Sequence, residues 1–231
     1  MQTGTLYIVS TPIGDPEDIS FRALRILGQV TLIVCEDARI TRPLLDFHTI
    51  RSDTVAFTGR SDIDPIAVAI AVLLGGQDVA LVSDVGTPLI ADPGISLVRR
   101  AVEAGIVVSA VPGPSALVGA LTVSGISAQR FLFDGFPPRA QSDRIAFFSA
   151  LKSECRTIVL FETRQHLHRT LLDLIASLGE NREICIVRDL TRQTETITRG
   201  RLRDVEIRFS RNIARGEYAV VISGAVETKI H

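Results

Sequence analysis

The feature that most constrains the fold is the alternation of short apolar runs with longer helical patterns through the first half of the chain. The apolar runs are Leu6–Ser10, Val30–Val34, Val79–Ser83 and Ile106–Val111. Helical patterns follow them at about residues 18–27, 38–47, 65–74 and 95–104. Apolar runs without polar alternation are typical of strands that are buried on both faces of a parallel sheet. The first half is therefore predicted to be an α/β domain with parallel strands.

The second half has a different order of elements. Strands are expected at Phe131–Asp134, Thr157–Phe161, Glu183–Arg188, Glu195–Gly200 and Glu217–Ser223, and helices at 139–152 and 164–178. No long helical pattern separates the last two strands, which predicts some antiparallel pairing and hence a mixed sheet. Glycine and proline cluster at residues 112–128, so two α/β domains are predicted, 1–115 and 116–231.

Charge is distributed unevenly along the chain, although the net charge is only −1. Residues 1–120 hold 8 arginines and 13 acids, which gives −5. Residues 121–231 hold 15 arginines, 2 lysines and 13 acids, which gives +4. Arginine is suited to bidentate contacts with phosphate, but a GC-rich genome would enrich it equally well. The basic half weakly favours a polyanionic partner.

Several classes of protein are excluded by patterns that the sequence lacks. The longest apolar run, Ile66–Leu74, is far shorter than the roughly 20 residues of a membrane span. The N-terminus lacks the pattern of a signal peptide, so a cytoplasmic protein is expected. The dinucleotide fingerprint, the P-loop and the G-x-S-x-G nucleophile elbow are all absent. The three cysteines and four histidines have no metal-ligand spacing, and no metal is expected.

Four loops that follow predicted strands of the first domain have an unusual composition. They are Ser10–Asp15, Cys35–Arg39, Ser83–Pro88 with its continuation to Gly94, and Val111–Ala116. Glycine and proline let backbone approach a ligand closely, and Ser, Thr and Asp add polar contacts. Ligands of parallel α/β sheets bind beyond the carboxyl ends of the strands. Any one loop could be an ordinary turn, but four at equivalent strand ends predict a ligand site.

The sequence of these loops resembles a known family. The matching strings are LYIVSTPIGDPEDISFRALRIL, VCEDARITRPLL, LVSDVGTPLIADPG, VPGPSALVGAL, FLFDGFPPR, VLFETRQHLHRTLLDL, IVRDLTRQTETITRGRL and RGEYAVVISG. In this order they resemble the ribosomal RNA small subunit methyltransferase I family, which is similar in fold to tetrapyrrole methylases and diphthine synthase. The resemblance covers nearly the whole chain, and SDVGTPLIADPG together with VPGPSA is its most specific part.

The resemblance implies an activity and a cofactor. Members transfer a methyl group from S-adenosylmethionine to a cytidine 2′-oxygen in the decoding region of 16S rRNA. The cofactor is expected in the cleft between the two domains. Its expected contacts are Pro12, Ile13, Gly14, Asp84, Gly86, Thr87, Pro88, Ser115, Ala116 and Phe161. Proteins of this fold are often homodimers, and the apolar stretch Pro65–Leu74 could serve as an interface or could equally be core.

Methyl transfer needs alignment of sulfur, methyl and acceptor, and a base helps because a ribose hydroxyl is a poor nucleophile. The candidate bases are Glu36, Asp37 and Glu162. Each could instead be a helix cap or the partner of a nearby arginine. The candidate substrate contacts are Arg39, Arg42 and Arg164. Aromatic residues make up only 5%, which favours recognition of backbone and shape, plausibly within the assembled 30S subunit.

The chain also departs from the family pattern. Asp15 replaces the usual Asn, Gly59–Asp62 replaces a His-Asn-Glu stretch, and Phe161–His166 replaces a Tyr-Glu-Ser-Pro-His string. These departures leave three alternatives open. They are a tetrapyrrole or other small-molecule methyltransferase of the same fold, a methyltransferase of another acceptor such as a protein side chain, and a non-catalytic paralogue that binds S-adenosylmethionine.

Overall fold

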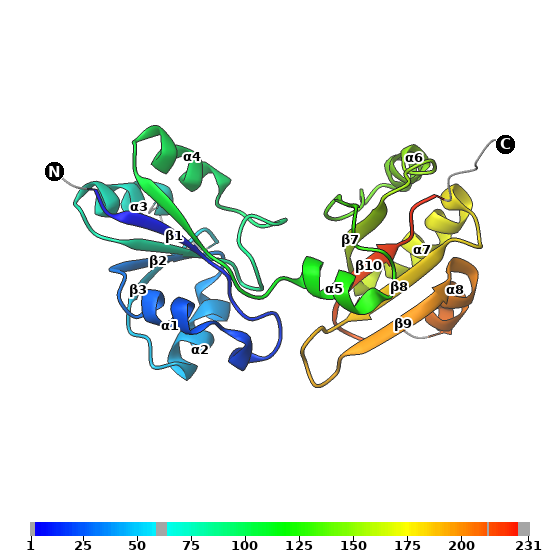
Figure 1. Ribbon diagram of the computed structural model, residues 1–231, viewed down its shortest axis with the longest axis horizontal. Coiled ribbons are helices and arrows are strands. Elements are labelled where there is room, and N and C mark those ends of the chain that lie inside the picture. Colours follow the sequence, from blue (N-terminus) through cyan, green and yellow to red (C-terminus); the bar gives the residue numbers. More distant parts are fainter. Residues whose placement is uncertain (1–2, 59–63, 212, 226–231) are drawn as a thin grey trace. The chain divides into compact units, whose positions relative to one another are not determined.

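Two units make up the chain, Met1–Ser115 and Ala116–His231. The structure is a computed structural model that describes residues 3–58, 64–211 and 213–225 (Figure 1). The Gly59–Asp62 stretch therefore lies wholly outside the described residues. Each unit contains one five-stranded sheet covered by helices, and the units are described separately below.

The first unit has a parallel sheet with the strand order β3-β2-β4-β1-β5. Its strands are β1 Thr5–Val9, β2 Leu32–Cys35, β3 Asp53–Ala56, β4 Val79–Val82 and β5 Val107–Val111. Its helices are η1 Pro16–Asp18, α1 Phe21–Leu27, α2 Ala38–Phe47, α3 Pro65–Leu74 and α4 Ile95–Glu103. Helices α1 and α2 cover one face, and α3 and α4 cover the other (Figure 1). The predicted parallel α/β architecture is confirmed.

Burial across this sheet follows strand position. Every residue of β2 and β4 is buried, because both strands have a neighbour on each side and helices above and below. Strand β5 was expected to be buried as well, but it is an edge strand that pairs only with β1, and the side chain of Val107 is 60% exposed. The apolar run predicted the strand correctly but its burial wrongly, because composition does not show that a strand lies at the edge of a sheet.

Capping side chains fix the starts of two helices in the first unit. Ser20 accepts a hydrogen bond from the backbone of Ala23 (3.1 Å) and caps α1. Asp64 caps α3 through the backbone of Ile66 (2.9 Å). Both contacts satisfy donors that a helix start leaves free. Helix α1 begins later than expected because Asp15 caps a separate 3-10 turn, η1, before it.

The second unit has a mixed sheet with the strand order β6-β7-β10-β8-β9. Its strands are β6 Phe131–Phe133, β7 Thr157–Thr163, β8 Glu183–Arg188, β9 Thr196–Arg201 and β10 Glu217–Ile222. Its helices are α5 Ala116–Ser124, α6 Gln141–Ala150, α7 Arg164–Leu178 and α8 Leu202–Arg211. β6 pairs with β7 in parallel, and all other pairs are antiparallel. The predicted mixed sheet is confirmed.

Besides the turn η1, a helix and a strand were missed by sequence reasoning. Helix α8 lies between the last two strands, where no long helical pattern was expected, because it buries only Leu202, Val205 and Glu206 among charged neighbours. Strand β3 was missed because it is a four-residue edge strand with no fully buried residue. In the described segments, no helix has both the length and the apolar character needed to cross a membrane.

Candidate functional site

The four loops singled out in the sequence leave neighbouring strands of the first unit. Their strands stand side by side in the order β2-β4-β1-β5 and are parallel, so their carboxyl ends share one edge of the sheet. Backbone bonds join the loops directly: Thr11 N–H donates to Gly86 O (2.9 Å), and Ser10 N–H donates to Val111 O (3.2 Å). The predicted clustering of these loops is confirmed.

Buried hydroxyl groups hold the turn that follows β4. The Thr11 hydroxyl lies 3.1 Å from Ser83 O and 3.3 Å from Gly86 O, and the Ser83 hydroxyl donates to Gly86 O at 2.9 Å. Thr11 and Ser83 are both buried. Gly86 has φ 86°, a left-handed conformation that favours glycine. The two polar side chains therefore serve to shape the turn.

Thr87 links this turn to the loop after β5. Its hydroxyl donates to Pro114 O (3.0 Å) and lies 3.2 Å from the Ser10 hydroxyl. The backbone at Gly113 runs close to Ser10, where an added Cβ would lie 3.0 Å from the Ser10 Cβ. The Thr87 hydroxyl therefore holds three loops together, and its expected contact with a cofactor stays a prediction. The three loops thus form one hydrogen-bonded unit at the carboxyl edge of the sheet.

Backbone strain is concentrated in the same β4 loop. Leu89 and Ala91 have φ values of 72° and 66°, which non-glycine residues rarely adopt. Gly94, which ends the loop, has φ 117°. Such strain costs about 1–3 kcal/mol per residue and persists only where the surroundings enforce it. The loop is therefore held in one shape by its contacts, as a preorganised site requires.

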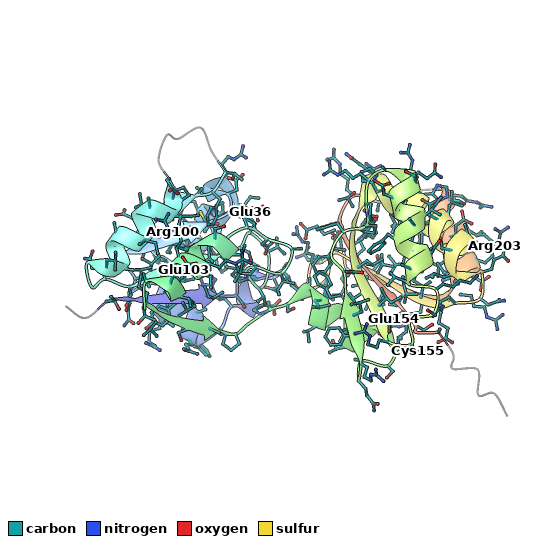
Figure 2. All side chains as sticks on the ribbon, turned by 90° about the horizontal axis from the view of Figure 1, so that it is seen from above. Glu36, Arg100, Glu103, Glu154, Cys155 and Arg203 are labelled. Atoms are coloured by element: carbon teal, nitrogen blue, oxygen red, sulfur yellow. The ribbon has the colours of Figure 1, made fainter. Side chains whose placement is uncertain are left out.

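A group of carboxylates stands at this edge. Glu36 follows β2 (labelled in Figure 2), and Asp84 and Asp92 belong to the β4 loop. Burial raises the pKa of Asp92 to about 6, and the nearby charges of Glu36 and Asp84 add to the effect, which a contact with the Ser83 hydroxyl opposes. Burial also raises the pKa of Glu36 and of Asp84. The cluster thus favours binding of a cation or a proton.

Asp37 has a structural role beside this cluster. It caps α2, and its carboxylate accepts hydrogen bonds from Arg39 N (2.9 Å), Nε (3.0 Å) and Nη2 (2.5 Å). These bonds lower the pKa of Asp37, so it is a weak proton acceptor. The Arg39 side chain is 88% exposed. Arg42 is directed inward, and its Nη2 donates to the Thr54 hydroxyl (2.8 Å).

The remaining predicted polar residues lie in the second unit. Glu162 is 6% exposed and accepts hydrogen bonds from the Thr170 hydroxyl (2.5 Å) and Thr163 N (2.7 Å). Both of its oxygens are thus held inside the unit. Arg164 begins α7, and its Nε donates to Ile213 O (2.7 Å).

Phe161 and Ala116, two predicted cofactor contacts, also belong to the second unit. Phe161 lies in β7 with its ring 4.9 Å from that of Phe133 and 5.8 Å from that of Phe136. Phe136 is 52% exposed. Ala116 is the first residue of α5. Their contact with a cofactor stays a prediction.

Asp92 is the residue that sequence reasoning overlooked. It stands in the quoted string ADPG, but its motif alone does not show that Glu36 and Asp84 would lie close to it. The available signal was an acid between loop-forming residues, after a buried strand. Only the sheet order, which places β2 beside β4, brings the three carboxylates together.

Comparisons with known proteins agree with this architecture. Residues 5–206 match the family described as Tetrapyrrole (Corrin/Porphyrin) Methylases. A relative from Thermotoga maritima is 41% identical over 96% of this chain and 99% of its own length, and one from Xylella fastidiosa is 41% identical over 97% and 83%. Both are named ribosomal RNA small subunit methyltransferase I.

A solved structure shares the fold. It is a cobalt precorrin-4 methyltransferase, with a TM-score of 0.72 and 17% identity over 95% of this chain and 94% of that one. At that identity the likeness concerns the fold alone. The full-length identity to the two bacterial relatives carries the finer assignment and confirms the predicted resemblance. The chain therefore belongs to the tetrapyrrole methylase family, and within it to the methyltransferases that these two relatives represent.

Proposed function

We propose that this protein uses S-adenosylmethionine to methylate RNA of the small ribosomal subunit, at the 2′-hydroxyl of a cytidine. The observation that carries the proposal is the joined set of loops at the carboxyl edge of the first sheet, in a chain 41% identical to relatives of that name. The names of those relatives suggest RNA of the small ribosomal subunit as the methyl acceptor. The family resemblance suggests the 2′-hydroxyl of a cytidine as the atom that is methylated.

The residues of the first unit fit the proposed cofactor. S-adenosylmethionine carries a sulfonium and an ammonium against one carboxylate, so it is a net cation, and it supplies the methyl group when bound. The half-buried carboxylates of Glu36, Asp84 and Asp92 favour a cation. The close backbone approach at Gly113 and the left-handed turn at Gly86 fix the shape of the loops that would hold the cofactor.

The cofactor contacts that we propose lie mainly in these loops. They are Pro12, Ile13 and Gly14 after β1, Asp84, Gly86 and Pro88 after β4, and Ser115 and Ala116 after β5. Thr87 acts by holding the loops together. Phe161, with Phe133 and Phe136 beside it, offers an aromatic surface of the kind that stacks on adenine.

For the proton acceptor we favour Glu36 among the three candidates. Its carboxylate accepts no hydrogen bond within the described part of the chain, and burial raises its pKa toward the working pH. Asp37 is occupied by Arg39, and both oxygens of Glu162 are occupied within the second unit. Glu36 would take the hydroxyl proton as the methyl carbon bonds to the oxygen and its bond to the cofactor sulfur breaks, with the neutral thioether as leaving group.

The remaining parts of the proposal concern location and assembly. A protein that methylates the small ribosomal subunit would act in the cytoplasm. Arg39, 88% exposed, could contact phosphate. Recognition of shape rather than base edges favours the assembled 30S subunit as substrate.

Helix α3 has no charged residue and leaves Leu74 50% exposed, which supports a homodimer interface on that helix.

The decisive test is methyl transfer from labelled S-adenosylmethionine to 30S subunits from a strain that lacks this protein, followed by digestion to nucleosides. Label in 2′-O-methylcytidine is expected. Label in another nucleoside would overturn the acceptor, and cofactor binding without label on any acceptor would support a non-catalytic paralogue. Comparable activity on a short naked RNA would contradict the need for the assembled subunit.

The assignment of Glu36 is tested by Glu36→Gln. Its matched control is Glu103→Gln, an exposed glutamate at the end of α4 in the same unit (Figure 2). The first change is expected to lower kcat about 10²–10⁴-fold with cofactor affinity reduced far less. The control should leave both parameters unchanged. Equal kcat for the two variants would remove Glu36 from the chemistry.

A further inference from the structure

We propose that an arginine-lined groove between α7 and α8 binds the phosphate backbone of the RNA that the protein methylates, an inference that rests on the proposed function. The groove has a volume of about 370 Å³. It is called the α7–α8 groove below, and it is lined by Arg164, Gln165, His168, Phe209, Arg211 and Ile213. It lies wholly within the second unit.

The charge at the rim of the groove is not neutralised. Arg164 is anchored by its Nε on Ile213 O (2.7 Å), and its terminal nitrogens have no partner among the described residues. Arg211 forms no ion pair within the same set of residues. The nearest acid on α8, Glu206, is directed to His168 Nε2 (3.0 Å), and its side chain is only 10% exposed. Two guanidinium groups thus face solvent without a carboxylate.

One more exposed arginine stands at the sheet edge beside the groove. Strands β7 and β8 flank β10 and both pair with it in antiparallel fashion, so Glu162 and Arg188 stand opposite Tyr218. The residues that follow β7 and β8 therefore emerge at the same sheet edge. Arg188 reaches toward the segment before β10 and donates to Arg215 O (3.3 Å). Arg188 itself is only 16% exposed and lies 3.8 Å from the Asp189 carboxylate, so Arg164 and the exposed Arg215 carry the positive charge at this edge.

The chemistry of the surface fits an RNA strand better than a single small anion. Phe209 and Ile213 add apolar side chains to the lining beside the two arginines, and the Phe209 ring lies near that of Tyr218 (6.3 Å between centroids). Alternating phosphates and flat apolar groups are the pattern of a single-stranded nucleic acid. Guanidinium groups bind phosphate oxygens in bidentate fashion. Contacts of this kind position the strand without reading its sequence.

The expected effect follows from counterion release. Each phosphate contact with a single strand contributes about 0.7 to the slope of log affinity against log salt. At 0.1 M salt this corresponds to roughly five-fold in affinity per arginine, or about 25-fold for two. Replacing Arg164 and Arg211 should therefore lower the slope by about 1.4.

The test compares Arg164→Gln/Arg211→Gln with Arg203→Gln. Arg203 lies at the opposite end of α8, is 54% exposed and has only a 3.9 Å ion pair with Glu180 (Figure 2). Binding to 30S subunits is measured across a salt series. We expect about 25-fold weaker binding at 0.1 M salt and a smaller slope for the double variant, with wild-type behaviour for Arg203→Gln. Equal affinity and slope for all three proteins would overturn the proposal.

Two further measurements separate this proposal from the proposed function. Arg211→Gln alone, which breaks no hydrogen bond among the described residues, should weaken binding about five-fold even if Arg164→Gln disturbs the fold. Cofactor affinity should be unchanged in every variant, because the carboxylate cluster belongs to the first unit. If wild-type protein binds subunits but transfers no methyl group, the proposed function fails, and the salt series still decides for or against the groove.

Discussion

Replacement of Asp92 by Asn should make the folded protein more stable while weakening cofactor binding. Asp92 is half-buried in the strained loop after β4, and Glu36 and Asp84 lie near enough to act on its charge. An ionised carboxylate in that position is destabilising, because it gives up water and faces two like charges. Asparagine has nearly the same shape and removes the charge.

The magnitude and its pH dependence follow from the pKa. Folding raises the pKa of Asp92 from 3.8 to about 6, so the folded state holds the proton more tightly than the unfolded chain does. The stabilisation from the protonated group is complete below pH 3.8 and is lost as pH rises to about 6. At about 1.4 kcal/mol per pKa unit, the loss approaches about 3 kcal/mol above pH 7. Partial exposure to solvent reduces it, so about 1–3 kcal/mol is expected.

Thermal unfolding of wild type and Asp92→Asn at pH 5 and pH 8 measures this effect. The variant should unfold roughly 2–12 °C higher at pH 8, and the gain should be about half as large at pH 5. Asp18→Asn, in the exposed turn η1, is the control and should change little at either pH. Calorimetry should show weaker binding of S-adenosylmethionine by Asp92→Asn. A gain independent of pH, or a loss of stability at pH 8, would refute the reasoning.

Three other substitutions test single contacts. Glu162→Gln should lower the free energy of unfolding by about 1–3 kcal/mol, because the Thr170 hydroxyl loses a charged acceptor. Methyl transfer by the folded protein should persist, and a lower kcat in a fully folded variant would restore Glu162 as a candidate base. Arg144→Met should lower the free energy of unfolding in urea by about 3–5 kcal/mol, because it leaves the buried Asp173 carboxylate, 2.7 Å from Arg144 Nη2, without its ion-pair partner. Adding Asp173→Leu should recover most of this loss, and no recovery would contradict the ion-pair account. Gly113→Ala should weaken cofactor binding while the thermal midpoint falls only slightly, because the added Cβ would crowd the loop after β1. A lower thermal midpoint with unchanged cofactor binding would argue against a role of Gly113 in the site.

The sequence predicted the fold well where local signals were strong. The apolar strands β2 and β4 and the capped helix α3 appear within a residue or two of their expected bounds. Helix α8 was missed because its buried stripe is narrow, with Leu202 and Val205 among charged residues. Such a helix is stabilised mainly by packing on the sheet, and packing cannot be read from a local pattern.

The site was predictable in outline and not in its internal roles. The composition of the loops showed where ligands could bind, because every parallel strand ends at the same edge. Which polar groups are available could not be known, since hydrogen bonds between distant segments decide it. Thr87 is held by Pro114, and Glu162 is held by Thr170. Asp92 gained its role through the neighbouring position of β2 and β4.

The opposite charges of the two units match two ligands of opposite charge. The first unit, with a net charge of −5, holds the carboxylate cluster proposed to bind a cationic cofactor. The second, with +4, holds the α7–α8 groove proposed to bind a polyanion. A chain with a net charge of −1 would thus attract both proposed ligands, because each would meet the field of the nearest unit and not of the whole molecule. The net charge of the whole sequence alone suggests neither a cationic nor an anionic ligand.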